Sequence, residues 1–214
     1  MSSPHDSDYP RRGNAFSRWL ARGFLRLAGW RVTNPMPAVP KAVIIGGPHT
    51  SNWDGIYTLA AMMQLGLDAH VMIKDSAFKW PFGTMLRWMG ALPIARHKAG
   101  GVVEQTVEQF HSRDKLVMVV APEGTRGGAT QWKTGFYRIA QKAGVPIVVA
   151  TADYRKKEIT FARVIEPCGD VEKDLAEIFE CYAAIHPRHP DKLSAPLKAI
   201  RDKKKSAGRQ TPDA

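Results

Sequence analysis

A histidine and an aspartate lie five positions apart within residues 46–55, a glycine-bearing stretch that directly follows an apolar run. His49 could act as a general base, because the imidazole of histidine has a reference pKa of about 6.5, close to neutral pH. Asp54 would then hold the imidazole so that its other nitrogen takes a proton. The same residues have a second interpretation, because Ser51 followed three positions later by Asp54 is a capping-box pattern. The spacing alone leaves open whether Asp54 serves a catalytic pair or only caps a helix.

Two further stretches carry cations suited to a phosphate group. Residues 121–128 follow an apolar run. The glycines of this stretch leave backbone N–H groups available to a ligand, and Thr125 and Arg126 add hydrogen-bond donors suited to a phosphate. Arg96 follows a short apolar run that begins at Gly90. Together the two arginines would form an anion pocket. The alternatives are an ordinary glycine-rich turn and two separate surface arginines.

The motifs of several other catalytic classes are absent from the sequence. It contains no G-x-S-x-G, G-x-x-x-x-G-K-[ST], G-x-G-x-x-G or H-E-x-x-H. Its two cysteines, Cys168 and Cys181, provide neither a disulfide framework nor zinc-ligand spacing. His186 and His189 have the spacing H-x-x-H, but no further metal-ligating residue is evident beside them. We therefore expect no metal site and two reduced thiols.

The alternation of apolar runs and amphipathic segments predicts the elements that must position these residues. Strands are expected at residues 42–45, 69–73, 116–121, 147–151 and 158–164. Helices are expected at residues 52–65, 78–89, 102–110 and 135–143, with a later amphipathic helix over 171–185. Strands that alternate with helices predict an α/β fold, a single layered domain whose central, mostly parallel sheet is flanked by helices.

Residues 14–31 have helical periodicity, with most of their bulky apolar side chains on one arc. The arc consists of Phe16, Trp19, Leu20, Phe24, Leu27 and Trp30. Arg18, Arg22 and Arg26 fall on another face, and Leu25 does not fit this division. Each central arginine opposes insertion across a bilayer by about 2.5–3.5 kcal/mol. The helix therefore either lies in a membrane interface or packs its aromatic face on the protein's own core, and the sequence favours both interpretations equally.

Positive charge is concentrated at the two ends of the chain. Of the net charge of +11, residues 1–40 contribute +4 and residues 192–214 contribute +5, so the middle is almost neutral. Such ends can meet anionic lipid, nucleic acid or water, and the sequence has no nucleic-acid recognition motif. No apolar run reaches the ~18–20 residues of a spanning helix, and no secretory signal is evident. These observations predict a cytoplasmic protein.

Residues 78–89 are unusually rich in Phe, Trp and Met. The segment is either part of the core or the wall of an apolar groove that touches lipid. Lys74, Lys79 and Arg87 around it favour the second interpretation slightly.

Four blocks of the sequence together resemble those of the glycerolipid (lysophospholipid) acyltransferases, the family of the bacterial 1-acylglycerol-3-phosphate acyltransferases. In the family's order they are His49-x4-Asp54, residues 90–96, residues 122–126 and residues 145–148, within residues 41–165. The resemblance implies acyl transfer from acyl-CoA or acyl carrier protein to a lipid hydroxyl, without a cofactor. It implies His49 as the base and Asp54 as its partner. The residues that it implies around the phosphate of the acceptor are Arg96, Glu123, Gly124 and Arg126, in addition to Thr125.

The sequence departs from the family's pattern at three places. Pro48 precedes the histidine, where the family usually has Asn, and Gly127 stands where Ser commonly follows the E-G-T-R block. The long hydrophobic N-terminal segment of many members is reduced to one arginine-bearing amphipathic helix. These departures concern the acceptor more than the chemistry. The acceptor could be a different lysolipid or another lipid-like alcohol.

One general base suffices for such a transfer. A thioester expels a thiolate whose conjugate acid has a pKa of about 8.5, so the leaving group needs little help from an acid. We therefore expect direct transfer in one complex, without an acyl-enzyme. Backbone N–H groups at the helix start, residues 51–53, are one candidate for the oxyanion donors.

The domain organisation follows from these patterns. We predict a disordered basic leader over residues 1–13, an amphipathic interfacial helix over 14–32, an acyltransferase domain over 41–186 and a basic, flexible tail over 187–214. The expected partners are a lysolipid acceptor, an acyl thioester donor and an anionic membrane surface, with no nucleic acid. The protein would be attached peripherally to the inner face of the cell membrane. The competing hypothesis is a non-catalytic module that binds anionic lipid through residues 14–31 and the tail, and such a module would not need His49.

Overall fold

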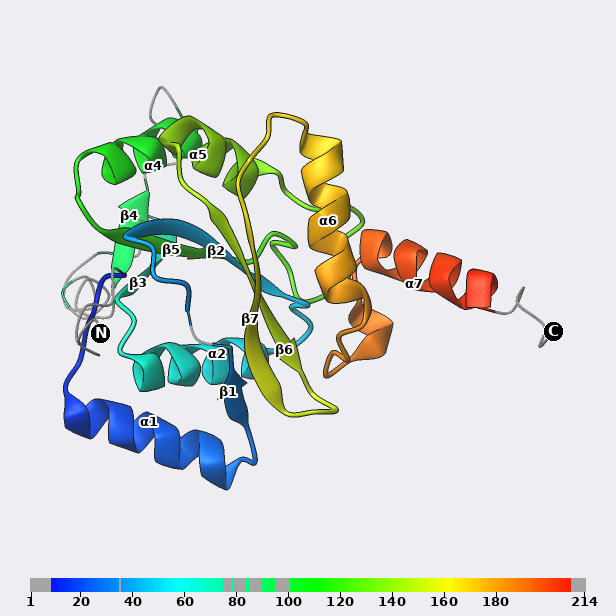
Figure 1. The fold of residues 1–214 in the computed structure, drawn as a ribbon, viewed down its shortest axis with the longest axis horizontal. Helices are drawn as coiled ribbons and strands as arrows, with labels where there is room; N and C mark the ends of the chain where they lie inside the picture. Colours follow the sequence, from blue (N-terminus) through cyan, green and yellow to red (C-terminus); the bar gives the residue numbers. More distant parts are fainter. Residues whose placement is uncertain are drawn as a thin grey trace, which may run out of the picture.

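The apolar runs of the sequence form the strands of one sheet, and the amphipathic segments form helices on both of its faces (Figure 1). The computed structural model describes residues 9–34, 36–74, 78, 84, 90–94 and 101–208. The strands are β1 (Arg31–Thr33), β2 (Lys41–Gly47), β3 (Ala69–Lys74), β4 (Ala91–Ile94), β5 (Leu116–Val120), β6 (Ile147–Asp153) and β7 (Glu158–Ile165). The helices are α1 (Ala15–Leu27), α2 (Asn52–Leu65), α4 (Gly101–His111), α5 (Gly135–Ala143), α6 (Val171–Ala183), the short 3-10 helix η2 (Pro190–Lys192) and α7 (Ala195–Gly208).

The seven described strands are ordered β1-β7-β6-β2-β5-β3-β4. Neighbouring strands run parallel, except that β6 and β7 are antiparallel. The prediction of an α/β fold with a mostly parallel sheet flanked by helices is therefore confirmed. Since β2 runs parallel to both β5 and β6, the loops that leave these three strands meet at one edge of the sheet. Ligands bind at this kind of edge in parallel α/β proteins.

The core consists of two layers, one on each face of the sheet. Successive side chains of a strand point to opposite faces, so Val43 and Ile45 of β2 pack against α4, α5 and α6, whereas Ala42 and Ile44 pack on the side of α2. Burial on both faces is typical of a parallel sheet. Helix α1 forms a further layer outside α2 (Figure 1).

Helix α2 has the bounds predicted from the sequence, because both of its ends carry strong local signals. Ser51 caps its N-terminus, and its side chain accepts a hydrogen bond from the N–H of Trp53. At the C-terminus, Gly66 adopts the left-handed conformation with φ 66°, which glycine adopts without steric cost. The helix thereby holds its first turn at the edge of the sheet where β2 ends.

Helix α1 buries a different face from the most apolar one. Ala21 and Leu25 are buried against the neighbouring elements, whereas five members of the predicted arc are 39–93% exposed. These five are Phe16, Trp19, Leu20, Phe24 and Leu27. Only Trp30 of the arc is buried, and it lies beyond the end of the helix. The interpretation that the aromatic face packs on the protein's own core is therefore wrong for α1.

The N-terminal helix is also shorter than predicted. It ends at Leu27, and Gly29 takes a positive φ of 76° that turns the chain. Arg31–Thr33 then form β1, which pairs with β7 and which the sequence analysis did not predict. The guanidinium of Arg31 donates hydrogen bonds to Glu158, so a charged pair reinforces this short strand.

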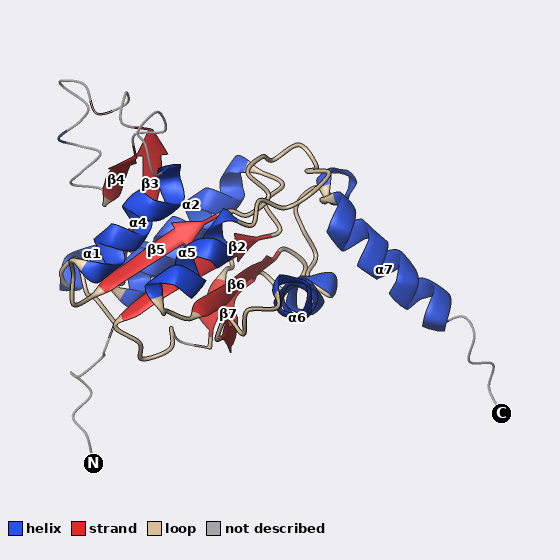
Figure 2. Cartoon of the chain, turned by 90° about the horizontal axis from the view of Figure 1, so that it is seen from above, coloured by secondary structure: helices blue, strands red, loops and turns tan. Residues whose placement is uncertain are grey.

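The C-terminal segment differs from the expected flexible tail. Leu193 and Leu197 are buried in the core layer beside α5 and α6, and they hold the start of α7 against the body. Arg201 donates hydrogen bonds to the carbonyl groups of Ala183 and Ile185 at the end of α6. The rest of α7 extends away from the sheet (Figures 1 and 2). A segment with many lysines can thus be helical when one leucine just before it and one in its first turn anchor its start.

Three predictions fall outside the described residues. The leader over residues 1–13 is described only from Tyr9 onward. Of the helix predicted over residues 78–89, only Phe78 and Thr84 are described. Arg96 is also outside the described residues.

Candidate active site

His49 leaves the carboxyl end of the central strand β2 and lies directly before α2. Its backbone N–H donates a hydrogen bond of 2.6 Å to Oε2 of Glu123, which comes from the loop after β5. Gly47, at the end of β2, lets the ring of Tyr182 pack closely against the strand, because a Cβ at position 47 would lie 3.3 Å from that ring. The loops after β2 and β5 are therefore joined directly beneath the histidine.

Asp54 serves as a capping residue and as a neighbour of His49 at the same time. Its Oδ2 accepts hydrogen bonds from the N–H groups of Thr50 (2.7 Å) and Ser51 (2.8 Å), which completes the capping box. The same oxygen lies 3.5 Å from Nδ1 of His49. The two interpretations of the sequence pattern are thus compatible, since one carboxylate occupies both positions.

The second carboxylate oxygen of Asp54 has a partner that the sequence analysis missed. The hydroxyl of Tyr154 donates a hydrogen bond of 2.6 Å to Oδ1 of Asp54. Tyr154 follows β6, the other parallel neighbour of β2, and lies 100 positions from Asp54 in the chain. A single sequence offers no signal for a contact at that separation.

The hydrogen bonds around Asp54 favour its ionised form. Burial alone would raise the pKa of this carboxyl, but hydrogen bonds from His49, Tyr154 and the two backbone N–H groups outweigh it and lower the pKa below its ordinary value. Burial and the nearby carboxylate raise the pKa of Tyr154. Asp54 is thus a carboxylate and Tyr154 a neutral hydroxyl donor at neutral pH.

Glu123 lies beneath the histidine loop and is only 4% exposed. Burial raises the pKa of its carboxyl, and the hydrogen bond from the His49 N–H only partly opposes this effect. Its Oε1 is buried without a hydrogen-bond partner. Little of this side chain is therefore accessible to a bound phosphate.

The other residues of the loop after β5 are more accessible. Arg126 is exposed, and its guanidinium donates a hydrogen bond to the side-chain oxygen of Asn52 in the first turn of α2. Thr125 accepts a hydrogen bond of 3.2 Å from the N–H of Gly127. Gly124 has a positive φ of 64°, so the turn requires glycine there. The loop thus brings one guanidinium beside the start of α2, whereas Arg96 is not described.

A second cation reaches the site from the segment after α6. The guanidinium carbon of Arg188 lies 5.4 Å from the ring centroid of Trp53 and 6.0 Å from that of Tyr154. The neighbouring His189 donates its backbone N–H to Oγ1 of Thr50 at 3.3 Å. Arg188 was not predicted as a site residue, because it lies in the segment expected to be a flexible tail and carries no local pattern that would place it beside α2.

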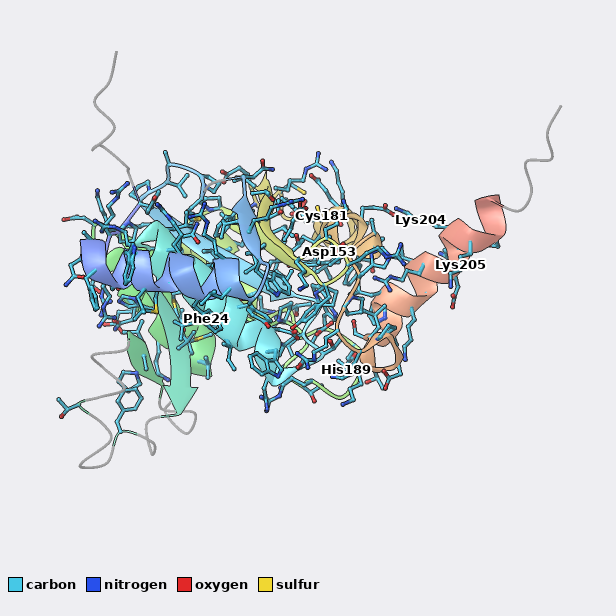
Figure 3. All side chains as sticks on the ribbon, turned by 90° about the horizontal axis from the view of Figure 1, so that it is seen from below. Phe24, Asp153, Cys181, His189, Lys204 and Lys205 are labelled. Carbon is cyan, nitrogen blue, oxygen red and sulfur yellow. The ribbon has the colours of Figure 1, made fainter. Side chains whose placement is uncertain are left out.

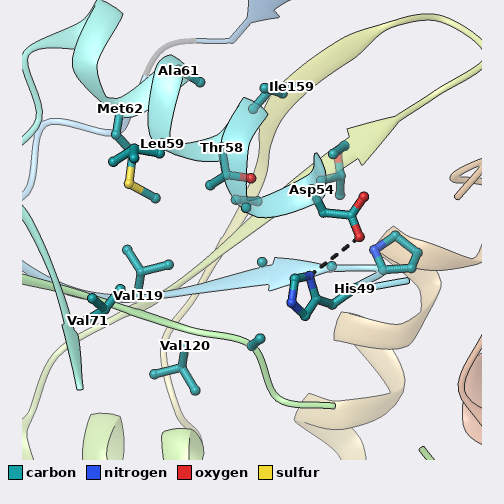
Figure 4. Close-up of a pocket in the computed structure, with 18 of the residues that line it drawn as sticks. His49, Asp54, Thr58, Leu59, Ala61, Met62, Val71, Val119, Val120 and Ile159 are labelled. Atoms are coloured by element: carbon teal, nitrogen blue, oxygen red, sulfur yellow. Dashed lines mark ion pairs between the residues drawn. The ribbon is translucent and has the colours of Figure 1, made fainter. Parts of the chain in front are cut away.

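An apolar cavity of about 180 Å³ begins at the His49–Asp54 pair and runs between α2 and the sheet. Figure 4 shows the pair at one end of the cavity and Met62, Val71 and Val119 at the other. Leu59 and Val71 line the cavity and are also 49% and 42% exposed. The cavity can therefore accept a flexible apolar chain whose polar end lies at His49.

The candidate oxyanion donors at the start of α2 are partly occupied. The N–H of Ser51 donates to Asp54, and the N–H of Trp53 donates to the side chain of Ser51 at 3.2 Å. The prediction is wrong for these two groups, because the helix cap uses both of them.

Comparisons with known proteins agree on one family. Residues 30–152 match the model of the family described as Acyltransferase. The chain is 29% identical over 159 residues to the 1-acyl-sn-glycerol-3-phosphate acyltransferase of Haemophilus influenzae, a match that covers 69% of this chain and 63% of the relative. It is 31% identical over 124 residues to the protein of the same name from Escherichia coli K12, a match that covers 54% of this chain and 49% of the relative. The chain thus spans between about half and two-thirds of the length of these relatives.

A solved structure shows a similar fold. The crystal structure of the 1-acyl-sn-glycerophosphate (LPA) acyltransferase PlsC from Thermotoga maritima superposes with a TM-score of 0.54 at 12% identity. The match covers 93% of this chain and 80% of that one. At this identity the likeness concerns the fold alone.

Proposed function

The chain belongs to the acyltransferase family, and we propose that it transfers a fatty acyl group from an acyl thioester to the hydroxyl of a lysophospholipid-like acceptor. One observation carries the proposal: an apolar cavity ends at the paired side chains of His49 and Asp54. An acyl chain in the cavity would bring its thioester carbonyl group beside the imidazole. The donor would be acyl-CoA or acyl carrier protein.

The proposed reaction uses His49 as the only base. The imidazole takes the proton of the acceptor hydroxyl while the hydroxyl oxygen forms a bond to the carbonyl carbon of the thioester. The carbonyl electron pair moves onto its oxygen and then returns as the C–S bond breaks. The thiolate takes the proton from the imidazolium, so the products are an ester and a thiol. Asp54 stabilises the imidazolium while it exists.

We assign the phosphate of the acceptor to Arg126. Its guanidinium is exposed and contacts Asn52, the first residue of α2. Asn52 follows His49 by three positions in the chain. Arginine binds phosphate through paired, charge-assisted hydrogen bonds. The names of the two relatives specify 1-acyl-sn-glycerol-3-phosphate, which makes this lysolipid the first acceptor to test. Glu123, being buried, would hold the backbone of His49 instead.

The protein would meet these lipids at a membrane surface through α1 and α2. The exposed apolar side chains of α1 form an outward face, and α1 lies outermost on the side of the molecule seen in Figure 3. Helix α2 adds exposed apolar side chains, namely Trp53, Ile56, Leu59 and Met63. Because Leu59 also lines the cavity, this surface continues to the cavity wall. Among the described residues, no helix is long and apolar enough to cross a bilayer.

The test is to incubate the purified protein with acyl-CoA or acyl carrier protein thioesters and a panel of lysolipids and lipid-like alcohols. Mass spectrometry should find an ester of one of these acceptors, and thiol release should accompany it. His49→Ala should lower the rate by about 10²–10⁴-fold, the usual contribution of a general base. Vesicle binding without any ester product would support the alternative of a non-catalytic lipid-binding module.

A further inference from the structure

We propose that Tyr154 is a positioning residue for the reaction, which holds the carboxylate of Asp54 in the orientation that His49 requires. The inference rests on the proposed function. Tyr154 lies two residues beyond the part of the chain that matches the family model, so the match does not assign it a role.

The hydrogen bonds of Asp54 are divided unequally between its two oxygens. Oδ2 accepts from two backbone N–H groups and faces Nδ1 of His49. Oδ1 accepts a hydrogen bond from the hydroxyl of Tyr154 at 2.6 Å. The Asp54 side chain is only 7% exposed, so water has little access to replace this donor. Without Tyr154, the carboxylate would turn to share its backbone donors between both oxygens, and Oδ2 would move out of line with the imidazole.

The ring of Tyr154 is held by contacts that do not involve its hydroxyl. Trp30 packs edge-on against it with ring centroids 4.9 Å apart, and Tyr57 packs edge-on at 6.2 Å. The backbone N–H of Tyr154 donates to the carbonyl group of His186 at 2.8 Å. A phenylalanine at this position would keep these contacts, so Tyr154→Phe removes only the hydroxyl.

The charged groups around Tyr154 and Asp54 keep the hydroxyl of Tyr154 protonated. Burial and the Asp54 carboxylate raise the pKa of Tyr154, and the guanidinium of Arg188 opposes them only in part. Glu123, another carboxyl group near His49, accepts a hydrogen bond from the backbone N–H of the histidine. Tyr154 therefore donates its hydrogen bond as a neutral hydroxyl and transfers no proton.

The chain offers a matched control for this hydroxyl. Tyr137 also donates a hydrogen bond to a buried aspartate, with 2.8 Å between its hydroxyl and Oδ2 of Asp174. Asp174 lies in the first turn of α6 and Tyr137 in α5, in another part of the fold. Tyr137→Phe thus removes the same kind of bond without touching the site.

The experiment compares Tyr154→Phe, Tyr137→Phe and the wild type in acyl transfer from pH 5 to pH 9. We expect kcat to fall by about ten- to a hundredfold in Tyr154→Phe, the range for losing a hydrogen bond to a charged group, with both KM values changed less than about twofold. The acidic limb of its pH–rate profile should move to lower pH, because a misaligned carboxylate stabilises the imidazolium less. Tyr137→Phe should change neither quantity. An unchanged kcat, or a limb at or above its wild-type position, would overturn the proposal.

A second measurement does not depend on activity. The Nδ1–H proton of His49 in the ¹H NMR spectrum reports its contact with Asp54 without any substrate. We expect this resonance in the wild type and in Tyr137→Phe, and we expect it to be shifted or lost in Tyr154→Phe. An unchanged resonance in Tyr154→Phe would overturn the positioning role, whereas a wild type that transfers no acyl group would contradict only the proposed function.

Discussion

Replacing Asp54 by asparagine removes one charge and keeps the shape of the side chain, so it separates the proposed catalytic role of this residue from its capping role. The amide oxygen of the variant can still accept the hydrogen bonds from the Thr50 and Ser51 N–H groups, which measure 2.7 and 2.8 Å in the wild type. The new NH₂ group would face the hydroxyl of Tyr154, which can accept a hydrogen bond. The helix cap should therefore survive, and only the negative charge beside His49 is lost.

The expected magnitude follows from the distance between the two side chains. An imidazolium and a carboxylate 3.5 Å apart attract each other by about 5 kcal/mol at an effective dielectric constant of about 20. At about 1.4 kcal/mol per factor of ten, this energy corresponds to a rate loss of about 10³–10⁴-fold. The cost in stability is smaller, because the three charge-assisted hydrogen bonds from Thr50, Ser51 and Tyr154 become neutral ones. This change lowers the free energy of unfolding by about 1–3 kcal/mol.

The assay combines thiol release during acyl transfer with urea unfolding of the same preparations. Asp174→Asn is the matched control, since Asp174 is also buried and accepts hydrogen bonds from a tyrosine hydroxyl and a backbone N–H. We expect both variants to lose similar stability, but only Asp54→Asn to lose activity. A folded Asp54→Asn protein with activity within tenfold of the wild type would refute the catalytic pair and leave Asp54 as a helix cap.

Three further predictions concern binding, stability and membrane contact. Arg126→Ala should raise the KM for a phosphate-bearing acceptor by about ten- to a hundredfold and the KM for the thioester by less than about twofold. Steady-state kinetics measure both constants, and an unchanged KM for the acceptor would contradict the assignment of Arg126 to the phosphate. Burial raises the pKa of Glu123 above its ordinary value of 4.5, so the wild type loses stability as the pH rises above 4.5 and through the raised pKa. Glu123→Gln cannot ionise, so its stability in urea unfolding should gain on that of the wild type as the pH rises. A stability difference independent of pH would contradict the raised pKa. The triple replacement of Arg18, Arg22 and Arg26 by Glu should abolish co-sedimentation with anionic vesicles at low salt, because each arginine contributes about 1 kcal/mol at such a surface. Unchanged vesicle binding would place the membrane contact on another surface of the protein.

Local signals account for the parts of the fold that were predictable from the sequence. Helices α2 and α5 begin and end at the predicted residues, and both end before a glycine in the left-handed conformation, Gly66 and Gly144. The central strands are continuous apolar runs with neighbours on both sides, so their position in the sequence was clear. Strand β1 was missed, because three residues are too few to form a recognisable pattern and only pairing with β7 defines them.

The remaining features depend on contacts between distant parts of the chain. The buried face of α1 is set by small and aliphatic residues, Ala21 and Leu25, that lie against its neighbours. The positions of the bulky apolar side chains left open whether the aromatic face packs on the core or lies in a membrane interface. Tyr154 and Arg188 reach the site from segments far along the chain, where no local pattern marks them. His49 and Asp54 were identifiable because one short loop and one helix cap hold both.

The pairing of β1 with β7 also determines when the N-terminal part of the molecule is completed during synthesis. Arg31 and its partner Glu158 are 127 positions apart, an interval that a ribosome takes about 6–25 s to translate at about 5–20 residues per second. Helix α2 is available to α1 much earlier, whereas β1 has no strand to pair with until β7 is made. The nascent chain therefore presents the aromatic face of α1 to its surroundings before the sheet that positions His49 is complete, so the proposed attachment to a bilayer does not require the folded site.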